Sequence, residues 1–102
     1  MDASTVFDDI IALAESAFDA ANEIDLERLE VIQKEISQLL LELSKLSIKE
    51  DNREQIQRAI EIQDSICTVL EENKQKYKKQ ISEIQTGIEA NRAYQSNQDD
   101  YF

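Results

Sequence analysis

Apolar residues recur three and four positions apart through most of this 102-residue chain, which is the spacing of an amphipathic α-helix. Three long segments carry the pattern, and short polar stretches near residues 22–25 and 47–52 separate them. The chain contains no proline and one glycine, a composition typical of all-helical proteins. The sequence therefore predicts an all-α fold, an antiparallel three-helix bundle with helices at about residues 5–21, 26–46 and 52–94.

The helix ends have recognisable signals. Thr5 followed by Asp8 resembles a capping box, which predicts a first helix that begins near residue 5. At the first turn, Asn22 tolerates the left-handed conformation that ends helices, and Asp25 is a good N-cap for the second helix. Asp51 or Asn52 is expected to cap the third.

The second segment has the most regular periodicity. A heptad-like seam, in which successive members are three or four residues apart, consists of Leu29, Ile32, Ile36, Leu39, Leu43 and Leu46. Val31 and Leu41 point away from this seam, either as single exposed aliphatic residues or as part of a second binding face.

The third segment is unusually long. From residue 51 to residue 94 there is no proline and a single glycine, Gly87, so a continuous helix would measure about 65 Å, against roughly 30 Å for the segment before it. Antiparallel neighbours should have similar lengths, so about half of this helix would lack a neighbour. We expect that half to fold back at a break, to pack on a second copy, or to bind a partner.

The third segment also changes character along its length. Its apolar arc is broad from residue 56 to residue 70, and beyond residue 73 it narrows to a seam for one neighbour. A register shift in this seam predicts a kink or a break near residues 73–80, which would create a fourth helix. The domain should span residues 1–95, with residues 96–102 as a frayed polar tail. The narrow seam consists of Tyr77, Ile81, Ile84 and Ile88.

Charge is distributed unevenly along the chain, whose net charge is −11. Residues 1–30 hold nine acidic residues and one arginine, whereas residues 73–102 carry a small positive excess. A chain this acidic repels nucleic acid and anionic lipid, so we expect neither as a partner. The basic cluster could be a solvated face that complements the acidic first helix, or a docking patch for an acidic partner or for that helix. It consists of Lys74, Lys76, Lys78 and Lys79.

The search for catalytic chemistry is negative. The chain has no histidine, a single cysteine and a single glycine, which excludes His-based catalysis, zinc sites that need histidine, and glycine-rich phosphate loops. We expect no enzymatic activity, no metal and no cofactor. Cys67 is expected to be a buried structural thiol. No apolar run approaches the ~20 residues that span a bilayer, and the N-terminus lacks the positive region of a signal peptide. We therefore expect no membrane insertion and a cytoplasmic location.

Two stretches resemble a known family. Residues 20–30 (AANEIDLERLE), and the heptad that begins QISEI at residue 80 and ends in Asn-x-Ala-Tyr at residues 91–94, are similar to the flagellar export chaperones of the FliT type. The FlgN type and other small helical secretion chaperones share these motifs loosely. Length, acidity and helix order fit over nearly the whole chain. Ile24 and Asp25 stand where the family usually has an aromatic residue.

The resemblance implies a cytosolic chaperone that binds the helical C-terminal segment of an export substrate, which for the FliT type is the filament-cap protein FliD. It also implies that residues 73–94 form a regulatory arm, which folds over the groove or is released toward the export ATPase complex or a transcription regulator. The groove would lie on the second and third helices, although its lining could equally be ordinary core. The candidate lining residues are Leu40, Ile62, Ile66 and Val69.

Two other functions fit the same pattern. The chain could form a structural homodimer, in which two copies bury each other's long-helix seams without a client. In that case mutation of Ile81 and Ile84 to Asp should make it monomeric. It could also be a helical anti-activator that binds a transcription factor.

Overall fold

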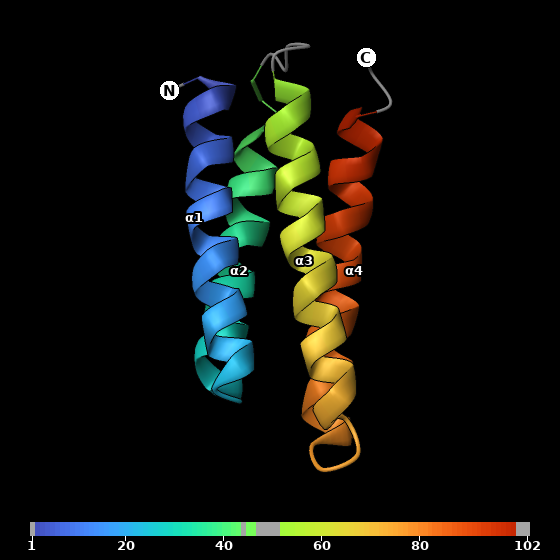
Figure 1. Cartoon of the computed structure of the whole chain (residues 1–102). Helices are drawn as coiled ribbons and strands as arrows, with labels where there is room; N and C mark the ends of the chain where they lie inside the picture. The colour runs from blue at the N-terminus through green and yellow to red at the C-terminus, as the bar shows by residue number, and fades with distance from the viewer. Residues whose placement is uncertain (1, 44, 47–51, 100–102) are drawn as a thin grey trace.

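The computed structural model describes residues 2–43, 45–46 and 52–99, which form four α-helices and no strand (Figure 1). This confirms the predicted all-α class. The helices have similar lengths, between 18 and 22 residues. They are α1 (Ala3–Asn22), α2 (Leu26–Leu43), α3 (Arg53–Asn73) and α4 (Lys78–Asp99).

The long third segment is broken. α3 ends at Asn73 and α4 begins at Lys78, so the break lies inside the stretch that the register shift indicates. The chain folds back there, and the molecule measures 42 × 22 × 17 Å instead of extending a 65 Å rod. The single helix to residue 94 is therefore wrong and the fourth helix is correct. α4 continues to Asp99, four residues into the expected frayed tail, and residues 100–102 lie outside the described part of the chain.

The four helices occupy the corners of a square. α1 packs against α2 and α3, and α4 packs against the same two helices. Within the described residues the diagonal pairs, α1 with α4 and α2 with α3, have no Cα atoms within 8 Å of each other. α1 and α3 begin at the same end of the bundle at which α2 and α4 finish, so α1 and α3 run parallel, as do α2 and α4 (Figure 1). α4 therefore has two neighbours, and the expectation of a one-neighbour arm is wrong.

Asp2 caps α1, where a capping box at Thr5 was expected. The Asp2 carboxylate accepts a hydrogen bond from the Thr5 backbone N–H at 2.9 Å and another from the Thr5 hydroxyl at 3.1 Å. The N-cap of α2 is as expected, because Asp25 Oδ1 accepts from the Arg28 N–H at 3.3 Å. Asn52 occupies the N-cap position of α3 but makes no side-chain capping hydrogen bond; its side-chain amide donates to Ser4 Oγ of α1 at 2.9 Å. Asp51, the other expected cap, lies outside the described residues.

The left-handed residue between α1 and α2 is Ile24, with φ 55°, and not Asn22. The Ile24 N–H bonds to the Ala21 carbonyl at 3.1 Å, and the Asp25 N–H bonds to the Ala20 carbonyl at 2.9 Å. These two bonds are those of a Schellman motif, whose left-handed position is usually glycine. A β-branched residue is strained in this conformation, so the turn forms despite its sequence.

The core combines small residues of α1 with larger aliphatic residues of the other helices. Ala14, Ala17, Ala20 and Ala21 are fully buried, which lets α2 and α3 approach α1 closely. On α2 the buried stripe differs from the predicted seam, because Leu40 is 3% exposed whereas Leu39 is only half-buried. Val31 and Leu41 are exposed, as their position off the seam predicts. A second binding face there stays a prediction.

Candidate functional site

α2 and α3 pack on either side of α1, and together they form a surface that we call the trough. α4 covers this surface. The α2 and α3 backbones are not adjacent in the described structure, and α4 packs against both of them, diagonally opposite α1. Ile81 and Ile88 of α4 are fully buried and Ile84 is 7% exposed, while Tyr77 in the preceding turn is half-buried. The three isoleucines of the predicted seam are thus buried within one chain and are not exposed to a second copy in this conformation. A homodimer stays a prediction.

In the second half of α4, buried polar residues continue the three- and four-residue spacing of the isoleucine seam. Ile81, Ile84 and Ile88 are followed at three and four residues by Asn91, which is 7% exposed, and Gln95, which is fully buried. α3 does the same, because Gln63 is fully buried between Ala59 and Ile66. Sequence reasoning that follows apolar residues alone misses these positions. Continuing each heptad through its polar members would have found them.

A hydrogen-bonded group joins α4 to α2 inside the bundle. The Asn91 side-chain amide donates to Gln33 Oε1 at 3.2 Å. The Ser37 hydroxyl lies 3.0 Å from both Asn91 Oδ1 and the Gln33 carbonyl oxygen, and its single proton can go to either acceptor. Gln33 is itself 6% exposed, so the amide pair is shielded from water.

Other buried amide atoms have no protein partner among the described residues. They are Gln33 Nε2 and both polar side-chain atoms of Gln63 and Gln95. A buried polar group without a hydrogen bond lowers stability by about 1–3 kcal/mol. The second half of α4 is therefore held less firmly than its isoleucine half.

The sequence of α4 weakens the helix in two further ways. Lys78 and Lys79 stand in its first turn, which contains no acidic residue, although the positive end of the helix dipole favours acids there. Gly87 lies in the helix interior, where glycine is less favourable than alanine by about 1 kcal/mol. Each of these features reduces the stability of α4 relative to the rest of the bundle.

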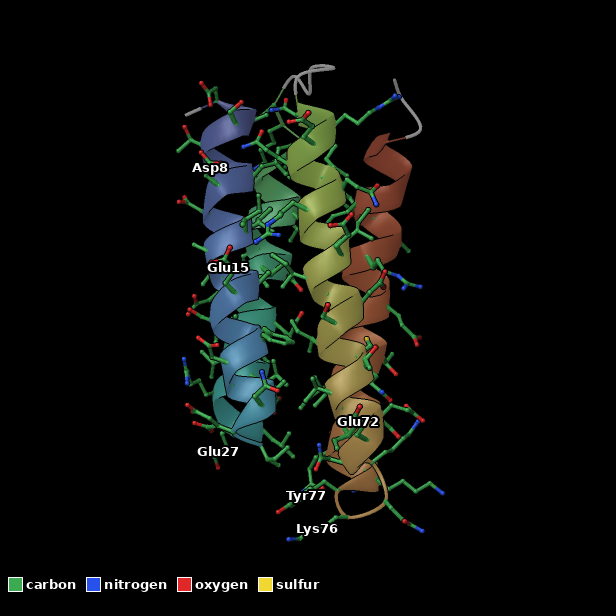
Figure 2. The ribbon with its side chains drawn as sticks, in the orientation of Figure 1. Asp8, Glu15, Glu27, Glu72, Lys76 and Tyr77 are labelled. Carbon is green, nitrogen blue, oxygen red and sulfur yellow. The ribbon has the colours of Figure 1, made fainter. Side chains whose placement is uncertain are left out.

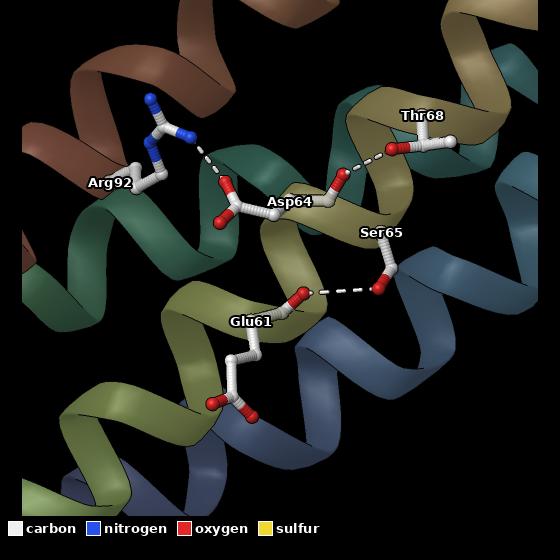
Figure 3. Close-up of polar contacts among 5 residues, drawn as sticks. All are labelled: Glu61, Asp64, Ser65, Thr68 and Arg92. Atoms are coloured by element: carbon white, nitrogen blue, oxygen red, sulfur yellow. Dashed lines mark hydrogen bonds and ion pairs between the residues drawn. The ribbon is translucent and has the colours of Figure 1, made fainter.

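Exposed polar contacts join α4 to α3 along the outer edge. Arg92 forms an ion pair with Asp64 (Figure 3). Gln85 donates to Glu71 at 2.9 Å. The hydrogen bond and charge of Asp64 raise the pKa of the Arg92 guanidinium. Both groups of the ion pair are about half exposed, so this contact adds little stability.

The structure divides the four predicted groove residues into two kinds. Ile66 is fully buried and Leu40 nearly so, and both belong to the hydrophobic core. Ile62 and Val69 are half-buried at the edge of that core. Ile62 lines a hollow of about 380 Å³ between α1 and α3, beside Phe18. No single surface groove therefore contains all four residues.

The lysine cluster lies at the end of the bundle where α3 turns into α4 (Figure 2). Lys74 pairs with Glu71 at 3.7 Å, and Lys76 Nζ lies 5.4 Å from the centre of the Tyr77 ring. Lys78 and Lys79 are exposed. No ion pair of the described residues connects this cluster to α1, whose Glu15 pairs with Arg58 of α3 instead.

The described residues contain no cluster of three or more side chains that could hold a metal ion. Cys67 is a free thiol and is half-buried, and burial, as the main cause, raises its pKa above the ordinary value. No helix in the described ranges combines the length and apolarity needed to cross a bilayer. Among the described residues, the distinguishing feature around α4 is therefore its set of buried amides.

No protein-family model matches this chain, and the searches of curated proteins and of solved structures also find no match.

Proposed function

We propose that this chain is a helix-binding export chaperone, in which the trough accepts an amphipathic helix of the client and α4 is the resident occupant. On this proposal the client is the helical C-terminal segment of a flagellar export substrate, the filament-cap protein FliD. The likeness of residues 20–30 and 80–94 to the FliT type supports the choice of client.

One observation carries the proposal: α4 fills the trough with a seam that is apolar in one half only. Ile81 and Ile88 are fully buried, but Gln95 continues the seam with both amide atoms unpartnered in the described structure. A competing helix with apolar residues along the whole seam would bury more apolar surface than α4 does. If it also offered hydrogen-bond partners to Gln33 and Gln63, it would recover stability that α4 leaves unrealised.

On this proposal the client displaces α4 from the trough, and the trough residues belong to the core only while α4 is docked. Leu40 and Ile66 contact the hydrophobic cluster while α4 is docked, and a client would meet them only after α4 leaves. The affinity for the client is then reduced by the fraction of molecules in which α4 is open. Variants that loosen α4 should tighten client binding, and variants that strengthen it should weaken client binding.

The test uses isothermal titration calorimetry with a synthetic peptide of the FliD C-terminal helix from the same cell. Ile88→Asp, which loosens α4, should bind the peptide several-fold more tightly than the unaltered chain. Gln95→Leu, which strengthens α4, should bind it more weakly while raising the free energy of unfolding. Glu89→Ala, on the exposed face of α4, serves as the matched control and should leave the affinity unchanged.

Circular dichroism of each variant checks that the bundle still folds. If Gln95→Leu stabilises the protein and yet leaves peptide affinity unchanged, displacement of α4 is not part of binding. If the peptide binds neither the unaltered chain nor Ile88→Asp, the proposed client is wrong.

A further inference from the structure

A second concave surface lies between the parallel helices α2 and α4, on the outside of the bundle. We call it the outer groove. It has a volume of about 410 Å³. Leu26 of α2 and Ile84 of α4 give it an apolar floor, and Glu27, Glu30 and Glu83 stand along it. It is distinct from the trough, because it requires α4 to be docked, whereas the trough is occupied by α4.

Gly87 keeps the floor of this groove open. It lines the groove, and a Cβ added at this position would meet no atom within 4 Å. Its φ is not positive, so the helix does not require glycine here. Close packing inside the bundle does not require it either, since the space beside it is empty. Besides weakening α4, the glycine therefore leaves open space in the groove, which an atom from outside the chain can occupy.

The charge of the groove indicates the sign of its occupant. The groove contains one base, Lys34, which already pairs with Glu30 at 3.5 Å. Glu27 and Glu83 have no ion-pair partner within the described part of the chain. The carboxylates of Glu27 on α2 and Glu83 on α4 thus face the apolar floor from opposite sides without a basic partner in the described residues.

We propose that the outer groove binds a basic amphipathic helix of a partner protein. An apolar side chain of that helix would lie over Gly87, between Leu26 and Ile84, and flanking lysine or arginine residues would pair with Glu27 and Glu83. The lining of the groove on α2 runs from Leu26 to Ser37, about 16 Å of helix at 1.5 Å per residue. That length matches about three turns of a docked helix, the usual way in which a groove between helices recognises an amphipathic segment.

A second copy of this chain is a poorer occupant. The chain carries a net charge of −11, so two copies repel each other. Its own basic cluster lies in the turn at residues 74–77 and the first turn of α4, at one end of the bundle, and not along an exposed helix face.

The probe is a fluorescein-labelled synthetic peptide of leucine heptads flanked by lysine, about four turns long, measured by fluorescence anisotropy. Glu27→Lys/Glu83→Lys reverses the charge of both groove walls. Glu35→Lys/Glu42→Lys is the matched control, because it changes the net charge equally at exposed α2 positions that do not line the groove. We expect the groove variant to lose about tenfold or more in affinity and the control about twofold.

Filling the groove gives an independent, charge-neutral test. Gly87→Leu should weaken the peptide several-fold without unfolding α4, because leucine is a strong helix former. In a nitrogen–proton correlation spectrum of the unaltered chain, the amide signal of Gly87, the sole glycine, should shift on addition of the peptide.

Three results would overturn the proposal. Equal losses in the groove and control variants would mean general charge attraction. Tighter peptide binding by Ile88→Asp would place the peptide in the trough, because loosening α4 dismantles the outer groove. A dimer detected by light scattering, and abolished by Glu27→Lys/Glu83→Lys, would make a second copy the occupant. None of these results decides whether FliD binds the trough, so the two proposals fail separately.

Discussion

Asn91 of α4 donates its side-chain amide to Gln33 Oε1 of α2 at 3.2 Å, in the interior of the bundle. The pair sits one turn beyond the last buried isoleucine of α4, where the apolar seam gives way to polar residues. A buried amide pair of this kind fixes the register of two helices, because a slip would leave both amides unpaired.

Removing one member of this pair should destabilise the bundle. Asn91→Leu leaves Gln33 Oε1 buried without its donor, and we expect the free energy of unfolding to fall by about 1–3 kcal/mol. Gln33→Leu/Asn91→Leu removes both amides and should recover most of that loss. Urea unfolding of the two single variants and the double variant gives the coupling energy. Additive effects would show that the hydrogen bond contributes nothing.

Replacing an unpartnered buried amide should stabilise the protein. Gln95 is fully buried with no partner for either amide atom in the described residues, so Gln95→Leu should raise the free energy of unfolding by about 1–2 kcal/mol. The control is Gln57→Leu on the exposed face of α3, which should change it by no more than about 0.5 kcal/mol. A loss of stability in Gln95→Leu would reveal an ordered water bound to the amide.

Relieving the strained turn should also stabilise the protein. Ile24 adopts φ 55°, which costs an L-residue about 1–2 kcal/mol relative to glycine. Glycine also increases the entropy of the unfolded chain, so we expect a net gain of about 0.5–1 kcal/mol for Ile24→Gly. Glu23→Gly is the control, since Glu23 has a negative φ of −85° and should gain nothing. Thermal unfolding compares the two, and an equal response would refute strain at Ile24.

The Cys67 thiol should react slowly in the folded protein. Burial raises its pKa, and because only the thiolate attacks iodoacetamide, alkylation at neutral pH should be slower than in the urea-unfolded chain. Because the pKa of the Cys67 thiol is higher in the folded state than in the unfolded state, the protonated thiol favours folding. Its contribution to the free energy of unfolding is complete below the unfolded-state pKa and is lost as pH rises through the folded-state pKa. Alkylation rates measured from neutral to alkaline pH test this. Equal rates in both states would contradict it.

The helices and their apolar faces could be predicted from the sequence because they depend on local spacing. Isoleucines at residues 81, 84 and 88 form one stripe on any helix, and their burial follows from the cost of exposing them. The break near residues 73–80 could also be located, since a register shift and a polar stretch coincide there. Asp25 could be recognised as an N-cap because its hydrogen bond reaches only three residues ahead.

What decides the candidate site is the arrangement of the helices in space. No local rule places α4 against both α2 and α3, and that placement turned the supposed arm into part of the core. The same placement buries Gln63 and Gln95, whose polarity alone indicates exposure. It also brings Glu27 and Glu83, which are 56 positions apart in the chain, onto one groove. Sequence periodicity fixes which face of each helix is apolar. Only the packing of the whole chain determines which neighbour covers that face, because burial depends on contacts between residues far apart in the sequence.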